Sequence, residues 1–240
     1  MPLIRAIIAG SALLSGAALL LSAGSSIAHA ADAARPTVIE LYQSQGCSSC
    51  PPANAILNRL AKTRPDLLPL SFAVTYWDRL GWKDEFAAPA YTQRQYDYAG
   101  ALWRGNVATP QFVVNGRRVV TGSDARELGT ALRAADRGTA GPAIGVQGGR
   151  VLIGVGKPAA SATVWLVRYD PRERVVKIGS GENGGRALPH RNIVTGLRPL
   201  GVWTGAPVSF PQPAYRDPAQ RSAVLLQQGR GGPIVAAGRI

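Results

Sequence analysis

The stretch that decides the fold is VIELYQSQGCSSCPPANAILNRLAK, residues 38–62. Residues 37–42 (TVIELY) are rich in β-branched and aromatic side chains and predict a short buried strand. The pair Cys47 and Cys50 follows directly. Residues 53–64 place apolar side chains at helical spacing, which predicts a helix. Since proline is tolerated in a first helical turn, Pro51-Pro52 indicates that the regular helix begins near Pro51.

The flanking sequence extends this strand–helix unit. Residues 67–77 (LLPLSFAVTYW) predict a second strand, so a parallel pair is expected. Residues 78–105 are aromatic and mixed in charge, with a helical patch at 90–101, and are typical of an insertion over one end of the sheet. Residues 111–114 and 117–120 predict two further strands joined by Asn115-Gly116, a strong hairpin turn. Asp124 then begins a helix that runs to about residue 135.

The composition changes after residues 138–142 (GTAGP), which we interpret as a linker. Hairpins are predicted within 143–155, between 162–169 and 174–178, and between 222–228 and 234–237. Short alternating strands with Gly/Pro turns and no good helical pattern favour a small β-sandwich or barrel. The predicted fold class is therefore an α/β domain at residues 35–137 with a helical insertion, followed by a sandwich-like all-β domain at residues 143–240.

The cysteine spacing points to redox chemistry. Cys47 and Cys50 are the only two cysteines, and a bridge between them closes too small a loop to stabilise the fold much. A thiol between a strand end and a helix N-terminus has a lowered pKa, because backbone N–H groups favour the thiolate there. We therefore expect Cys47 to attack a substrate disulfide and Cys50 to resolve the mixed disulfide. A second CxxC, which a zinc site would need, is missing.

Two longer stretches carry a family resemblance. Residues 37–137 resemble the thioredoxin-like superfamily, and TPQFVVNGRRVVTGSDARELGTAL (109–132) is similar to the C-terminal half of glutaredoxins. The resemblance implies that Pro110 is a cis-proline facing the dithiol and that Thr109 offers backbone hydrogen bonds to a bound peptide or thiol. ELYQSQGCSSCPPA, TYWDRLGWKDEFAAPAYTQRQ and GENGGRALPHRNIV resemble a secreted bacterial family, domain-of-unknown-function family 1223. This family brings no established substrate.

Other side chains near the motif are candidates for the site. Glu40, on the strand before the cysteines, could relay protons to Cys50, although it lies one residue from the position of the buried acid in thioredoxins; an outward-facing strand residue is the alternative. Tyr76 and Trp77 could line a substrate groove or simply pack in the core. His190 is better explained as a hydrogen-bonded strand residue than as a metal ligand. No metal and no cofactor beyond the dithiol is expected.

The first thirty residues predict export. Arg5, an apolar stretch at 6–21 and Ala28-His29-Ala30 together fit a secretory signal peptide with its cleavage site. We expect a periplasmic protein in an oxidising compartment. No later segment is apolar for long enough to span a bilayer, so no membrane insertion is expected after cleavage. The net charge of +13 comes from scattered arginines, which favour a solvated basic surface over a nucleic-acid site.

These observations leave three functional hypotheses. The first is an exported thiol–disulfide oxidoreductase that acts on protein thiols or a redox partner protein. The second is a binding or chaperone module on the same scaffold, in which the disulfide is inert. The third is delivery of copper or another soft metal by the dithiol, which lacks nearby Met or His ligands. The sequence fixes neither the client, nor the direction of electron flow, nor the oligomeric state.

Overall fold

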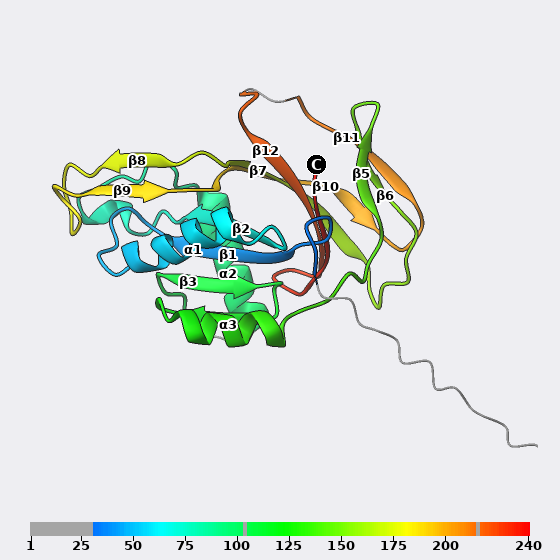
Figure 1. The fold of residues 1–240 in the computed structure, drawn as a ribbon, viewed down its shortest axis with the longest axis horizontal. Helices are drawn as coiled ribbons and strands as arrows, with labels where there is room; N and C mark the ends of the chain where they lie inside the picture. Colours follow the sequence, from blue (N-terminus) through cyan, green and yellow to red (C-terminus); the bar gives the residue numbers. More distant parts are fainter. Residues whose placement is uncertain (1–30, 103–104, 215–216) are drawn as a thin grey trace, which may run out of the picture.

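The computed structural model describes residues 31–102, 105–214 and 217–240 (Figure 1). Within them the chain is mixed α/β. The first half contains β1 (Thr37–Gln43), α1 (Pro51–Thr63), β2 (Leu67–Ala73), the 3-10 helix η1 (Asp78–Leu80), α2 (Pro89–Ala101), β3 (Gln111–Val114), β4 (Arg118–Thr121) and α3 (Ala125–Ala134). The second half contains β5 (Ile144–Gln147), β6 (Arg150–Ile153), β7 (Ala162–Asp170), β8 (Arg174–Lys177), β9 (Ala187–His190), β10 (Ile193–Trp203), β11 (Val208–Pro211), β12 (Arg221–Gln228) and β13 (Ile234–Arg239). The predicted signal peptide lies outside the described residues.

The elements of the first half follow the sequence pattern closely. β1 pairs in parallel with β2, and α1 connects the two strands. β1 also pairs antiparallel with β3, and β3 pairs antiparallel with the edge strand β4. α1 begins at Pro51 and α3 begins after Asp124, as predicted. The second strand ends at Ala73, earlier than predicted. The N–H of Thr75 instead donates to the hydroxyl of Thr92 in α2, at 2.9 Å. This bond to α2 takes the chain away from the sheet.

β1 is buried on both faces because helices cover it from both sides. Ile39 and Leu41 pack against α1 and α3, and the alternating residues Val38 and Tyr42 pack on the side of α2. Side chains that alternate along a strand point to opposite faces. Each large apolar side chain buried in this way stabilises the fold by roughly 1.5–3 kcal/mol. The layers fix β1, and hence the loop that follows it, at the centre of the sheet.

The Asn115-Gly116 turn also ties the layers together. Both residues have positive φ, 47° and 61°, as a two-residue hairpin of this type requires. The buried Asn115 side chain accepts a hydrogen bond from the N–H of Val38 and donates one to the carbonyl of Ala135, each at 2.9 Å. The turn therefore holds β1 and the end of α3 as well as its own two strands.

The second half continues the sheet of the first. The large sheet has the order β13-β12-β7-β10-β2-β1-β3-β4. The junction is narrow: Ile193 of β10 pairs with Ser71 of β2, and the side chain of Asn192 donates to the carbonyl of Pro69 at 2.7 Å. The predicted linker at 138–142 therefore marks no break in the sheet. The sequence pattern predicts two separate domains, whereas strands from both halves of the chain share one sheet. Local composition does not show which strands pair when they are distant in sequence.

The sandwich-like part of the second half is smaller than predicted. A three-stranded sheet, β11-β6-β5, covers one end of the large sheet through a core that includes Val151, Val164 and Trp203. The hairpin predicted between 162–169 and 174–178 is wrong. β7 pairs with β10 and β12, whereas β8 pairs with β9 in a hairpin of their own. Figure 1 shows this β8–β9 hairpin beside α1, at the opposite end of the molecule from β5, β6 and β11.

None of the helices in the described residues has the length and apolar character needed to cross a membrane.

Candidate functional site

Cys47 and Cys50 form a disulfide at the carboxyl end of β1 and the N-terminus of α1, with their Cα atoms 5.4 Å apart. The loop is held by backbone bonds. The N–H of Cys47 donates to the carbonyl of Ser44, and that of Cys50 donates to the carbonyl of Cys47, both at 3.1 Å. Asn54, in the first turn of α1, donates its N–H to the carbonyl of Cys50 at 3.0 Å. Both cysteines are 0% exposed.

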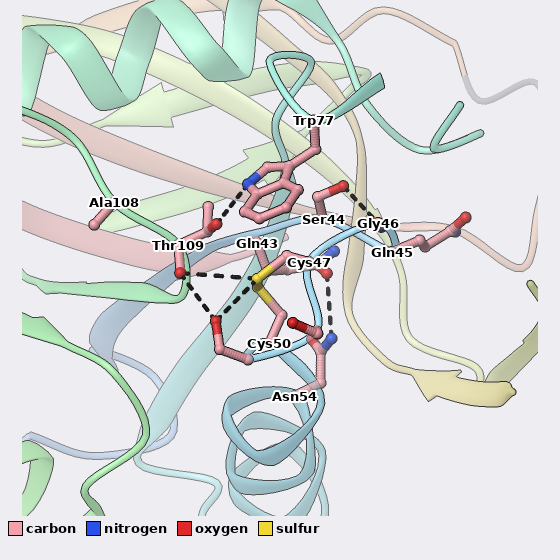
Figure 2. Close-up of a disulfide and its surroundings, with 12 residues drawn as sticks. Gln43, Ser44, Gln45, Gly46, Cys47, Cys50, Asn54, Trp77, Ala108 and Thr109 are labelled. Atoms are coloured by element: carbon pink, nitrogen blue, oxygen red, sulfur yellow. Dashed lines mark hydrogen bonds between the residues drawn. A yellow bond between two sulfur atoms is a disulfide. The ribbon is translucent and has the colours of Figure 1, made fainter. Parts of the chain in front are cut away.

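Thr109 and Pro110 lie beside the disulfide. The peptide bond between them is cis, as the resemblance implies. The carbonyl oxygen of Thr109 lies 3.8 Å from the Cys47 sulfur, and the hydroxyl of Ser49 lies 3.3 Å from the same sulfur. Trp77 donates its indole N–H to the Thr109 hydroxyl at 2.7 Å (Figure 2). The structure therefore brings together Cys47, Thr109, Pro110 and Trp77.

Tyr76 lies beside this group but faces α2. Its hydroxyl donates to the side-chain oxygen of Gln95 at 3.2 Å, and burial raises its pKa to about 12. Its hydroxyl therefore stays neutral at physiological pH.

The insertion between β2 and α2 also holds the cysteine loop from a second side. Trp82 donates its indole N–H to the Gln45 side-chain oxygen at 2.8 Å, and the carboxylate of Asp84 accepts the Gln45 N–H at 2.8 Å. Asp84 also accepts the N–H of Phe86 at 2.9 Å. Burial raises the pKa of Asp84 to about 6, although its two N–H donors oppose that shift.

The connection between β8 and β9, residues 178–186, covers the loop from a third side. The buried amide of Asn183 donates to the carbonyls of Gln45 and Cys47, at 2.8 and 2.9 Å. The side-chain oxygen of Asn183 accepts from Arg186 at 2.7 Å, which fixes the orientation of the amide. Glu182 accepts the N–H of Ser48 at 3.0 Å. This connection, hereafter the cover segment, is built from the second half of the chain.

Sequence reasoning missed the role of the cover segment. In the sequence, the stretch GENGGRALPHRNIV (181–194) carried the family resemblance and no predicted contact. Gly181 has a φ of 74°, which favours glycine, and a Cβ at Gly179 would lie 3.1 Å from the Trp82 ring. The one available signal was the polar Glu182-Asn183 pair between glycines, and it could not name a partner more than 130 positions away.

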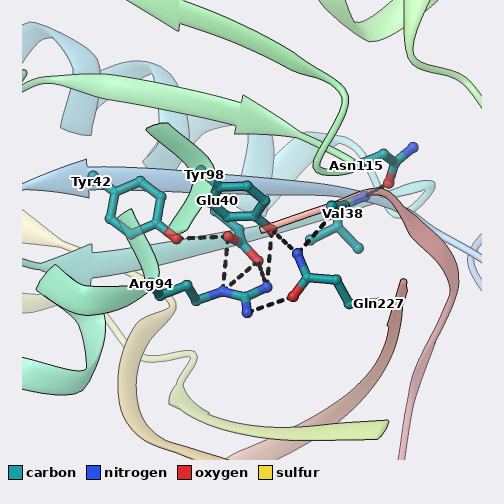
Figure 3. Close-up of polar contacts among 8 residues, drawn as sticks. Val38, Glu40, Tyr42, Arg94, Tyr98, Asn115 and Gln227 are labelled. Atoms are coloured by element: carbon teal, nitrogen blue, oxygen red, sulfur yellow. Dashed lines mark hydrogen bonds and ion pairs between the residues drawn. The ribbon is translucent and has the colours of Figure 1, made fainter. Parts of the chain in front are cut away.

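Glu40 points away from the cysteines. It is fully buried and forms a two-pronged ion pair with Arg94 of α2, at 2.7 and 3.1 Å (Figure 3). Tyr42 donates its hydroxyl to the same carboxylate at 2.8 Å. Gln227 of β12 accepts from Arg94 at 2.9 Å. Glu40 lies on the α2 face of β1, whereas Cys50 begins α1 on the opposite face. The predicted proton relay therefore has no contact to support it, and Glu40 instead joins the two halves of the chain.

His190 lies in β9 and is 0% exposed. The expected hydrogen bond is missing: neither ring nitrogen has a partner among the described residues. Its ring lies edge-on to that of Phe86, at 5.9 Å between ring centroids. Burial lowers the pKa of His190 to about 4, so the ring is neutral at physiological pH. In the described part of the chain, no three His, Cys, Asp or Glu side chains gather as a metal site would require.

Comparison with known proteins places this site in a family. The family model described as a protein of unknown function, DUF1223, matches residues 38–227. The chain belongs to this family. No curated protein matches the chain. The matched range of the family extends from β1 to β12, so it includes the cysteine loop, the insertion and the cover segment.

Two solved structures are similar to this member of the family. A crystal structure of a protein from Agrobacterium tumefaciens has 31% sequence identity and a TM-score of 0.68, and the match covers 85% of this chain and 93% of that one. HBP35 of Porphyromonas gingivalis has 12% identity and a TM-score of 0.58, with 86% and 75% covered. The second likeness concerns the fold alone. The first shows that both halves of the chain occur together in another protein.

Proposed function

We propose that this protein is an exported thiol–disulfide oxidoreductase with a thioredoxin-like fold. One observation carries the proposal: a CxxC disulfide lies between the carboxyl end of a central strand and a helix N-terminus, beside a cis-proline. A loop of this size adds little stability, so chemistry is the better reason for the pair. The order β2-β1-β3-β4, with one parallel and two antiparallel pairings, supports the proposed fold.

The chemistry needs only the two cysteines and a substrate. The Cys47 thiolate attacks one sulfur of a substrate disulfide, whose S–S bond breaks and releases a substrate thiolate. The Cys50 thiolate then attacks the Cys47 sulfur, which releases the second substrate thiolate and forms the Cys47–Cys50 disulfide. Two electrons and two protons pass to the substrate. The reverse sequence oxidises a substrate dithiol, and the substrate in either direction is a protein thiol or a redox partner.

The surroundings of Cys47 supply the docking surface in this proposal. The Thr109 carbonyl, 3.8 Å from the sulfur, can accept a backbone N–H from a bound peptide. Trp77, fixed by its bond to Thr109, forms an aromatic wall beside it. Pro110 has no N–H to donate, and the carbonyl of Thr109 is a polar group that the cis-proline turn offers beside the sulfur. The export signal and a periplasmic location remain part of the proposal.

Mixed-disulfide trapping tests the proposal. Cys50→Ala leaves Cys47 without a resolving thiol, so periplasmic extracts from cells that express it should contain covalent adducts that reducing agent releases. Cys47→Ala is the matched control and should trap nothing, because Cys50 begins the helix and is the resolving thiol. Equal trapping by the two variants, or none by either, would contradict the proposed reaction.

A second candidate function rests on burial. Both cysteines are 0% exposed, which suits an inert bridge in a binding or chaperone module. The reduction potential separates the two: a functional pair falls between about −120 and −270 mV, whereas a bridge that resists reduction below about −300 mV is structural.

A further inference from the structure

The charges and donors around Cys47 bear on the direction of electron flow. A dithiol becomes an oxidant when its reduced form is stabilised, chiefly by stabilising the thiolate of the attacking cysteine. Positive charge and free N–H groups at a helix N-terminus provide that stabilisation. A site that withholds them keeps the thiol protonated. Such a site favours the disulfide and makes the dithiol a better reductant.

Several N–H groups that would meet a thiolate are missing or engaged here, and the Ser49 hydroxyl, 3.3 Å from the Cys47 sulfur, can donate instead to the Thr109 carbonyl at 3.4 Å. Pro51 and Pro52 occupy the first two positions of α1 and carry no N–H. The N–H of Ser48 is taken by Glu182 and that of Cys50 by a backbone carbonyl. The carbonyl oxygen of Thr109 lies 3.8 Å from the Cys47 sulfur, and its partial negative charge repels a thiolate. Complete burial disfavours the charged sulfur further.

The charged side chains that hold the loop are mainly acidic. Glu182 accepts the N–H of the residue next to Cys47, and hydrogen bonding to Ser48 holds the pKa of this carboxyl below its usual value, so it is ionised at neutral pH. Asp84 accepts the N–H of Gln45 from the insertion. Arg186 is the cation of this group, and its guanidinium is bonded to Asn183. The local charge is therefore negative in a chain whose net charge is +13.

We propose that the Cys47–Cys50 pair works as a reductant and that Glu182 of the cover segment is the positioning residue that keeps it so; this inference rests on the proposed function. The reduced pair gives two electrons and two protons to a substrate disulfide. A donor protein with its own dithiol then reduces the Cys47–Cys50 disulfide again. Glu182 acts through its charge at the Ser48 N–H, one residue from Cys47, and through its hold on that N–H.

The first test is the pKa of the Cys47 thiol, measured by thiolate absorbance in the Cys50→Ala variant. We expect a value at or above the ordinary value of about 8.5. Adding Glu182→Gln should lower it by about half a unit to one unit, because the amide keeps the shape and an acceptor but loses the charge. Glu173→Gln is the matched control. Glu173 is an exposed carboxylate that pairs with Lys62, at the far end of α1 from Cys47.

The second test is the equilibrium of the intact pair with dithiothreitol under anaerobic conditions. If Glu182→Gln lowers the Cys47 pKa from about 9 to about 8, the reduced form gains about five-fold at pH 9 and almost nothing at pH 7. Glu173→Gln should match the wild type at both values. This growth of the effect with pH is not expected from a change in stability alone.

The outcomes separate the two proposals. If the wild-type pair exchanges with neither dithiothreitol nor a partner, the proposed function fails. If exchange occurs but the Cys47 pKa lies below about 7, the pair is an oxidant and only this inference is overturned. The same holds if Glu182→Gln and Glu173→Gln behave alike.

Discussion

Removal of the Asn183 side chain should break the hydrogen bonds between the cover segment and the cysteine loop that this side chain makes. Its amide nitrogen donates to two backbone carbonyls, Gln45 and Cys47, at 2.8 and 2.9 Å. Asn183 is 0% exposed, so water cannot readily replace those bonds. Asn183→Ala leaves both carbonyls without their donor. Asn183→Asp keeps the oxygen that Arg186 binds and places a second oxygen against the two carbonyls.

The expected cost follows from these contacts. A buried acceptor that loses its partner costs about 1–3 kcal/mol. Two such acceptors give a loss of about 2–4 kcal/mol in the free energy of unfolding for Asn183→Ala, since some water enters the space. At about 2–4 °C per kcal/mol for a chain of this size, the melting temperature should fall by roughly 4–16 °C. Asn183→Asp should cost at least as much, because oxygen then faces oxygen.

Denaturation with guanidinium chloride, followed by tryptophan fluorescence on the oxidised protein, measures these losses. Asn106 is exposed, and Asn106→Ala is the control for removal of an asparagine side chain; its effect should stay within about 0.5 kcal/mol. A wild-type stability for Asn183→Asp would refute the reasoning, because it would mean that the amide nitrogen does not face the two carbonyls.

Three further predictions concern the rest of the fold. Arg94→Met leaves the Glu40 carboxylate buried without its ion-pair partner and should cost about 3–5 kcal/mol in urea denaturation, whereas Arg94→Met with Glu40→Leu should recover part of that loss. The pKa of Asp84 is raised from 3.8 to about 6, so its contribution to stability is full below about pH 4 and is lost as pH rises through about 6; Asp84→Asn should flatten the pH profile of stability in that window, and an unchanged slope would contradict this. Asn115→Ala should cost about 2–4 kcal/mol, and Asn115→Gly, which restores the positive φ but not the two side-chain bonds, should recover only a small part by thermal denaturation.

Local signals in the sequence predicted the position of the cysteine pair and the strand, helix and turn around it. The strand before Cys47, the helix that begins at Pro51 and the Asn115-Gly116 turn all depend on residues within a few positions of each other. The periodicity of side chains and the conformational preferences of proline and asparagine decide such elements. That is why the first half of the fold follows the sequence pattern almost element by element.

Pairings between distant strands were outside the reach of the same signals. The pattern around Asp170-Pro171 is compatible with a hairpin, yet β7 pairs with β10 and β12 because their apolar faces complete a shared core. The face of β1 on which the Glu40 side chain lies is a second example. A shift of one residue along a strand moves a side chain to the other face, and so turns a candidate proton relay into an ion pair with α2.

The position of the cover segment changes how the second half of the chain relates to the site. If the second half of the chain only followed the first, its removal would leave the cysteine loop with all of its contacts. Here Asn183 and Glu182 come from a hairpin of the second half and bond the loop that carries Cys47. Both cysteines are buried, so in the proposed thiol exchange we expect a partner to displace part of this cover. Such a partner would compete with Glu182 for the Ser48 N–H and with Asn183 for the Cys47 carbonyl.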